Sequence, residues 1–171
     1  MNNKAEYIKK YLESKAVAYE MVEMEDSVVI RFHSKVPFSI FYLYEKTLLL
    51  RGDGLTIFTT TPYVIDEEAL PRFYEAINRI NTGYLNSGHF EVLESGHFRH
   101  VIHIELVDEV DDRRIEKALF VGTKQFVRYE DIVFCILEGT VAPDKITEFE
   151  SIYTDISEEK QLSKRLTEGS I

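Results

Sequence analysis

The stretch AINRINTGYLNSGHFEVLESGHFRHVIHIELV, residues 76–107, carries the pattern that decides the fold. It begins inside a helix, because Phe73, Ile77 and Ile80 recur at three- and four-residue steps and so share one face. Pro71 suits the first turn of that helix, and either Gly83 or the run from Asn86 to Gly88 ends it. Two strand-like segments follow and meet at Ser95-Gly96, so the stretch predicts a helix and then a β-hairpin.

The hairpin holds four of the five histidines of the chain, which raises the question of a metal or catalytic site. With a two-residue turn, Glu91 would face His100 and Glu94 would face His97. His97 and His103 would share a face about 20 Å apart, with His100 on the opposite face. Zinc needs three or four ligands that converge at about 2 Å. The spacing therefore predicts a solvated sheet face with His–Glu contacts and no metal or catalytic residue. His97 and His100 remain candidates for contact with a ligand or partner.

Asn78 and Asn81 form a second unusual pair, three residues apart at the edge of the helical stripe. Asparagine is a middling helix former, so two in one helix need a reason. Two interpretations stay open: the side chains cap the backbone of the neighbouring strand connection, or they contact a ligand or partner.

Upstream of this stretch, residues 18–65 read as strands. SVVIRFHS alternates, with Arg31 and His33 on one face, and RGDGLTIFTT predicts a hairpin that turns at Asp53-Gly54. Residues 3–15 form an amphipathic helix. Because short hairpin connections favour antiparallel pairing, the expected fold class is α+β, a twisted antiparallel sheet with helices packed on it.

Downstream, residues 111–138 predict a long helix whose apolar stripe faces the sheet. Gly122 lies on that stripe, where Ala would be a better helix former by about 1 kcal/mol, so we expect a close approach to a strand. Residues 1–138 are expected to form a single α+β domain. Residues 139–171 are expected to form an amphipathic, partly flexible segment, with apolar residues at helical spacing: Ile146, Phe149, Ile152 and Tyr153.

Composition narrows the function classes. The 171 residues carry 30 acidic against 20 basic side chains, a net charge of -10, which repels a phosphate backbone and favours a basic partner over nucleic acid. We expect the one cysteine, Cys135, to be a buried and inert thiol. No stretch reads as a signal peptide or a membrane span, so a cytoplasmic location without membrane contact is expected. Phosphate-loop, zinc-protease and hydrolase motifs are missing, and no cofactor is expected.

Residues 76–107 also resemble the YbjN-like family, described as candidate bacterial sensory transduction regulators. The resemblance rests on Asn78, Asn81, Gly88 and Phe90, and on the upstream meander PFSIFYLYEKTLLLRGDGLTIF; it covers roughly residues 5 to 138. It implies a fold like that of type III secretion chaperones, which are small, acidic and dimeric and bind extended segments of other proteins.

The expected function is therefore a non-enzymatic binding or regulatory module that engages protein partners as a homodimer. The alternatives are a chaperone for an exported protein, and a hydrolase or metal-dependent enzyme built on the hairpin and the asparagine pair. Clustered apolar residues on one sheet face would favour the first two. A cleft of converging His, Asn and carboxylate groups would favour the third.

Overall fold

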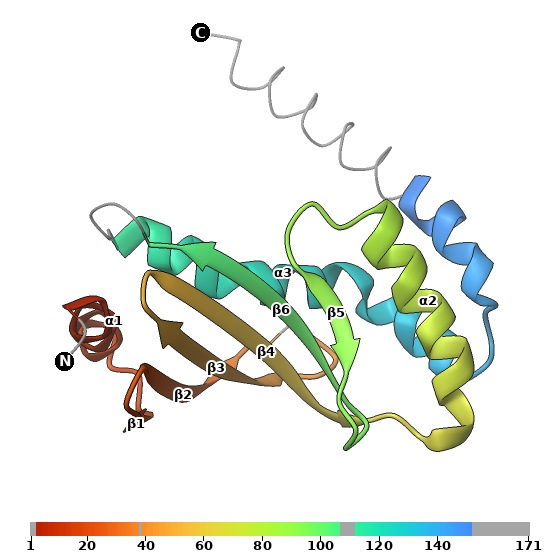
Figure 1. Ribbon diagram of the computed structural model, residues 1–171. Coiled ribbons are helices and arrows are strands. Elements are labelled where there is room, and N and C mark those ends of the chain that lie inside the picture. The colour runs from red at the N-terminus through yellow and green to blue at the C-terminus, as the bar shows by residue number, and fades with distance from the viewer. Residues whose placement is uncertain (1–2, 38, 107–111, 152–171) are drawn as a thin grey trace, which may run out of the picture.

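The computed structural model describes residues 3–37, 39–106 and 112–151 of the chain. Figure 1 shows one layer of helices against a strongly twisted sheet, which confirms the α+β class. The helices are α1 (Asn3–Ser14), α2 (Leu70–Gly83) and α3 (Asp112–Leu137), with short 3-10 turns at Glu67–Ala69 and Pro143–Lys145. The strands are β1 (Tyr19–Glu23), β2 (Ser27–Lys35), β3 (Leu43–Arg51), β4 (Gly54–Val64), β5 (His89–Val92) and β6 (His97–Glu105).

All neighbouring strands of the sheet are antiparallel, in the order β1-β2-β3-β4-β6-β5. The first four strands form a meander, and β6 then pairs with β4, so that β5 lies at the edge. The β3–β4 turn has its positive φ at Gly52, not at Asp53 or Gly54 as the sequence predicts. Glycine accepts this backbone conformation without a steric penalty, so the turn residues are one position earlier than expected.

The β5–β6 hairpin has a three-residue loop, and the predicted two-residue turn is wrong. The Leu93 amide donates to the His97 carbonyl oxygen at 2.9 Å, and Gly96 has a φ of +78°. A three-residue loop that ends in a left-handed glycine is a common hairpin connection. The added loop residue shifts the register by one, so His100 faces Phe90 and Glu91 faces Arg99.

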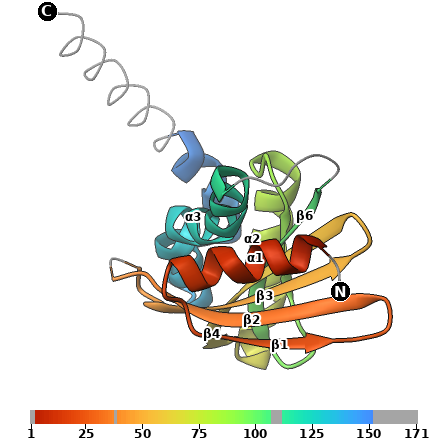
Figure 2. The ribbon, with the colours of Figure 1, turned by 90° about the vertical axis from the view of Figure 1, so that its left-hand side faces the viewer.

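Helices α1 and α3 cover one face of the sheet, as the turned view in Figure 2 shows. Beneath them lie two apolar clusters. One joins α1, the first half of α3 and the strand residues around Leu48 and Ile57; the other joins α2, the second half of α3 and the strand residues around Tyr44 and Phe98. Phe126 lies in the second cluster at 1% exposure, which confirms that the predicted stripe of α3 faces the sheet.

The described part of the C-terminal segment packs beside α2. Residues 146–151 are helical, and Ile146 is completely buried in the second apolar cluster with Phe149 packed against it. Arg72 of α2 donates to the carbonyl oxygens of Ile136 and Leu137 and so caps the end of α3. Ile152 and Tyr153 lie outside the described residues.

Candidate functional site

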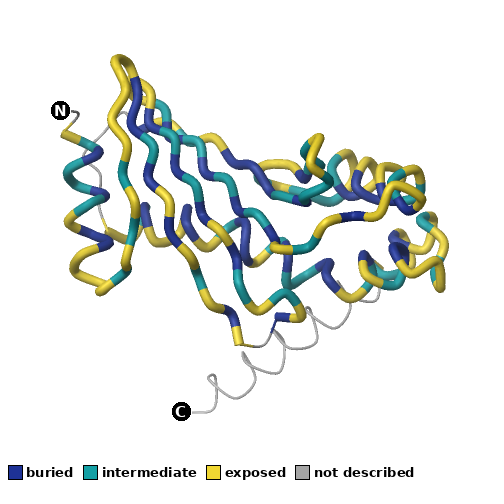
Figure 3. Tube along the Cα trace, turned by 90° about the horizontal axis from the view of Figure 1, so that it is seen from below, coloured by how far each residue is buried: buried dark blue, intermediate teal, exposed yellow. Residues whose placement is uncertain are grey.

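None of the described helices covers the second face of the sheet, and Figure 3 views the molecule from this side. Two neighbouring cross-strand rows carry most of its functional groups. One row contains His33, Glu45, Thr60, Arg99 and Glu91, and the other contains Arg31, Thr47, Phe58, Val101 and His89. Successive residues alternate between faces, so these rows are built from the same strands that line the core on the other side.

A hollow of about 470 Å³ lies on this open face. The Arg99 guanidinium stacks over the Phe58 ring at 4.3 Å from its centroid and forms an ion pair with Glu91. This geometry suits a cation–π contact and fixes the position of both side chains. The hollow is lined by Arg31, His33, Leu43, Glu45, Thr47, Phe58, Thr60, Thr61, Pro62, Leu93, His97 and Arg99.

A second hollow of about 340 Å³ continues the first toward β1. The two share Arg31, His33 and Glu45, so together they run across the sheet from β1 to β6. Within the described ranges Arg31 forms no ion pair, although it is exposed at the junction of the two hollows. The open face thus offers an aromatic ring, apolar side chains and a free guanidinium along one path.

A polar row crosses the core between the two apolar clusters, on the covered face. It consists of Lys46, Thr59 and His100, which pair across β3, β4 and β6, and it lies opposite Gly122 and Thr123 of α3. We call this set the polar row. Each of its members is buried, which is unusual for a lysine and requires compensating hydrogen bonds.

Lys46 is 2% exposed and donates three hydrogen bonds. Its Nζ lies 2.9 Å from Thr59 Oγ1, 2.9 Å from the Leu119 carbonyl oxygen and 2.7 Å from Thr123 Oγ1. All three acceptors are neutral, so none of them offsets the charge of the ammonium. Burial lowers the pKa of Lys46 to about 7.

His100 is completely buried beside Lys46. Its Nε2 lies 3.0 Å from the Ser87 carbonyl oxygen and donates to it, while its Nδ1 has no hydrogen-bond partner in the described part of the chain. Burial lowers the pKa of His100 to about 4, with a smaller contribution in the same direction from Lys46. A Cβ at Gly122 would lie 2.3 Å from Thr59 Oγ1 and 3.2 Å from His100 Nδ1. The predicted close approach at Gly122 is therefore confirmed.

The four residues that the sequence predicts as contacts for a ligand or partner, Asn78, Asn81, His97 and His100, do not lie together in the structure. His97 lines the open face, where its Nδ1 lies 3.0 Å from Ser95 Oγ. His100 is in the core, so the prediction that it belongs to a solvated face with a Glu91 contact is wrong; the one-residue register shift explains the error. His89 is the histidine whose imidazole lies near Glu91, at 3.5 Å.

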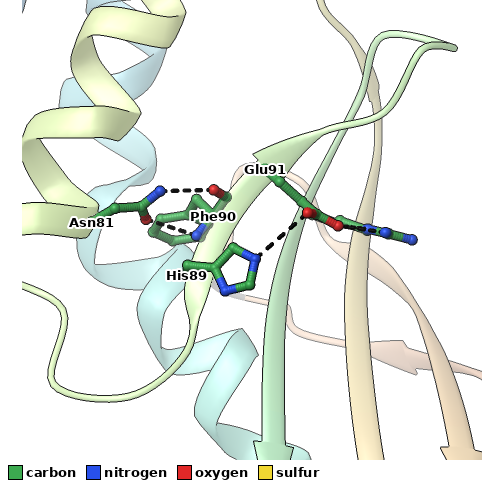
Figure 4. Close-up of polar contacts among 5 residues, drawn as sticks. Asn81, His89, Phe90 and Glu91 are labelled. Atoms are coloured by element: carbon green, nitrogen blue, oxygen red, sulfur yellow. Dashed lines mark hydrogen bonds and ion pairs between the residues drawn. The ribbon is translucent and has the colours of Figure 1, made fainter.

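The two asparagines also separate. Asn81 Nδ2 donates to the Phe90 carbonyl oxygen and Asn81 Oδ1 accepts from the Phe90 amide, each at 2.8 Å, as Figure 4 shows. The Asn81 side chain thus satisfies both backbone groups of Phe90 at the outer edge of β5, as a neighbouring strand would. This supports the backbone-capping interpretation for Asn81. Asn78 is exposed on α2, and its carbonyl oxygen accepts the Thr82 hydroxyl.

The sequence reasoning missed Lys46 and did not select Arg31, Phe58 or Arg99. The signal for Lys46 was present in LYEKTLLL, because alternation places it on the same face as Tyr44, Leu48 and Leu50. A lysine on an otherwise apolar strand face is a buried charge and indicates a special environment. Among the residues with described positions, no group of three or more His, Cys, Asp or Glu side chains converges on a metal position.

The comparisons with known proteins find similarity to solved structures only at the level of the fold. No family model matches the sequence, and no curated protein matches it. The chain is similar to the solved structure of YbjN from E. coli, described as a candidate transcription regulator. The TM-score is 0.49 and the identity 10%, over 80% of this chain and 90% of that chain. A similarity of this size carries no argument about function. None of the described helices has both the length and the apolar character needed to cross a membrane.

Proposed function

We propose that the protein is a non-enzymatic binding module with a regulatory role, which takes an extended segment of a partner protein across the open face of its sheet. The observation that carries this proposal is the continuous path of two hollows from β1 to β6. Open sheet faces with grouped apolar and charged side chains are common interaction surfaces, because burying them removes apolar area from water.

The dimensions of the path support a short extended segment. From β1 to β6 there are four strand spacings, in the order β1-β2-β3-β4-β6. At about 4.8 Å for each spacing the path is roughly 19 Å long, which about six residues cover in an extended conformation.

The chemistry of the path favours a segment that combines apolar and acidic side chains. The whole chain is acidic, but the larger hollow holds the guanidinium groups of Arg31 and Arg99 with the one carboxylate of Glu45, and the second hollow adds the carboxylate of Glu20. Since Arg99 is already paired with Glu91, Arg31 is the cation left for an incoming carboxylate. Phe58 and the neighbouring aliphatic residues offer the apolar contact. This local charge, not the net charge, decides which side chains fit.

The test is a selection from a random twelve-residue peptide library displayed on phage, followed by affinity measurements on synthetic copies of the enriched peptides. We expect enrichment of peptides with aromatic or aliphatic residues next to Asp or Glu. Arg31→Glu should weaken their binding about tenfold or more, because it places like charges together. The matched control is Arg113→Glu, which makes the same charge change at an exposed position on α3. Failure to enrich any peptide, or equal binding by the two variants, would count against the proposal.

We also propose that two copies pair through β1. No strand of the described chain covers the outer edge of β1, and Val22 in this strand and Met24 just after it are 57% and 50% exposed. Unpaired edges favour pairing with another strand, and a two-fold axis makes that pairing antiparallel. Light scattering should give a dimer that Val22→Lys converts to monomer; a wild-type monomer at micromolar concentration would exclude the pairing.

A further inference from the structure

A third pocket, of about 320 Å³, opens on the covered side of the molecule, between α1, β2 and α3. Its walls include the apolar side chains of Tyr11, Leu12, Phe32 and Leu119, which also belong to the first apolar cluster. Lys46 of the polar row forms part of the same lining. The pocket therefore joins an apolar wall to Lys46, the one buried lysine of the described residues.

The charges around this pocket are mostly positive. Lys15 at the end of α1 and Lys35 at the end of β2 line it together with Lys46, against the single carboxylate of Glu116. In a chain with a net charge of -10, this is a local reversal of sign. A pocket that is lined by charges of one sign and has low-dielectric walls attracts and concentrates ions of the opposite sign.

We propose that this pocket binds a small amphipathic anion, a carboxylate with a short aliphatic chain, whose charged group is paired with the Lys46 ammonium. This ligand is independent of the peptide on the open face, because the two sites lie on opposite faces of the sheet and share only Phe32 and His33 of β2. The aliphatic chain contacts the apolar wall, and the carboxylate supplies the counter-charge that the three neutral acceptors of Lys46 do not.

The hydrogen bonds of Lys46 can rearrange so that one of its N–H donors turns from a protein acceptor to the carboxylate of the ligand. Thr59 and Thr123 accept from Nζ, but a threonine hydroxyl can also donate. Thr123 is four residues after Leu119, so its hydroxyl is able to donate to the Leu119 carbonyl oxygen in the usual pattern for threonine in a helix. One donor of Lys46 then becomes available for the carboxylate without leaving a buried acceptor unpaired.

Anion binding is coupled to the protonation of Lys46. Since burial lowers the pKa of Lys46 to about 7, part of the population is neutral at pH 7.5 and most is neutral at pH 9. The carboxylate selects the protonated form, so its affinity should fall as pH rises above 7, approaching about tenfold for each pH unit above pH 8. The other titratable and charged groups that face this site are Tyr11 on α1 and Lys15 just after it, His33 and Lys35 on β2, Glu116 on α3, and His100 on β6.

The experiment is isothermal titration of the full-length protein with octanoate at pH 7.5 and pH 9. In this window octanoate stays ionised, and ordinary histidine and lysine side chains scarcely change charge. We expect affinity to fall about twentyfold between the two pH values, with proton uptake on binding. Octanol, with the same chain and no charge, should bind at least tenfold more weakly at pH 7.5.

Two variants test the role of Lys46. Lys46→Met, which keeps a similar apolar stem, should weaken octanoate binding about tenfold at pH 7.5 and remove the pH dependence. The matched control is Lys117→Met, an exposed lysine on α3 that does not line the pocket and should bind as the wild type does. Undetectable octanoate binding by the wild type, equal affinity for octanol, or an unchanged pH dependence in Lys46→Met would overturn the proposal. If Lys46→Met does not fold by circular dichroism, the wild-type pH series and the octanol comparison decide.

Discussion

Replacing Lys46 with methionine should change how the stability of the protein depends on pH. The ammonium has a pKa of about 7 in the folded protein, against 10.5 in the unfolded chain. Between these two values the unfolded chain binds more protons than the folded one. The free energy of unfolding therefore rises with pH across this window, and falls again toward pH 7 as the buried group takes up its proton.

The magnitude follows from the shift. Each pH unit inside the window adds up to about 1.4 kcal/mol to the stability of the wild type, and between pH 7 and pH 9.5 the gain is about 3 kcal/mol. In Lys46→Met this contribution disappears, while all other titrating groups stay. The difference in stability between wild type and variant should thus grow in favour of the wild type by about 3 kcal/mol over this range.

Urea unfolding followed by circular dichroism at pH 7, 8, 9 and 9.5 measures this difference directly. Lys117→Met serves as the control, because its ammonium is exposed and its stability curve should run parallel to that of the wild type. A difference between wild type and Lys46→Met that stays constant from pH 7 to pH 9.5 would refute the reasoning. Lys46 would then keep its proton in the folded protein.

Three further changes test the packing by urea unfolding. Phe126→Ala removes a ring that is 1% exposed and should cost about 3–5 kcal/mol, while the exposed Lys124→Ala should stay within about 0.5 kcal/mol of the wild type. Gly122→Ala places a Cβ 2.3 Å from a β4 threonine oxygen and should destabilise by about 1–3 kcal/mol; Gly83→Ala, which meets nothing within 4 Å, should be neutral or stabilising. Asn81→Ala loses both backbone hydrogen bonds to β5 and should cost about 2 kcal/mol.

The fold class could be predicted because the periodicities are strong and local. The stripe from Ile115 to Phe126 specifies a helix face, and the expected helix of residues 111–138 agrees with α3 to within a residue at each end where the chain is described. The strands of residues 18–65 alternate clearly enough to predict a meander. Gly122 could be explained in advance, because a glycine on an apolar stripe loses helix stability unless another backbone or side chain approaches it closely.

The candidate sites could not be predicted in the same way, since they depend on register and on contacts between distant segments. The loop before His97 has one residue more than the sequence predicts. As a result His100 pairs with Phe90 and is buried, whereas it was expected to pair with Glu91 on a solvent-exposed face. Nothing in local composition distinguishes a two-residue turn at Ser95-Gly96 from a three-residue loop that ends at Gly96. The pocket beside Lys46 needs α1 and α3, which are about a hundred residues apart in sequence.

The register of β3 determines both proposed sites at once. Glu45 points to the open face and Lys46 to the core, so a slip of one residue would exchange a carboxylate for the buried lysine and place the lysine beside Arg31. Such a slip would leave an acid facing the Leu119 carbonyl oxygen, two acceptors in contact, where only the Thr59 and Thr123 hydroxyls could donate. The polar row therefore disfavours the wrong register through its hydrogen-bond requirements, although it weakens the apolar packing that a leucine in place of Lys46 would provide. A buried lysine with three neutral acceptors costs stability, and its hydrogen bonds instead fix the strand alignment on which the open face depends.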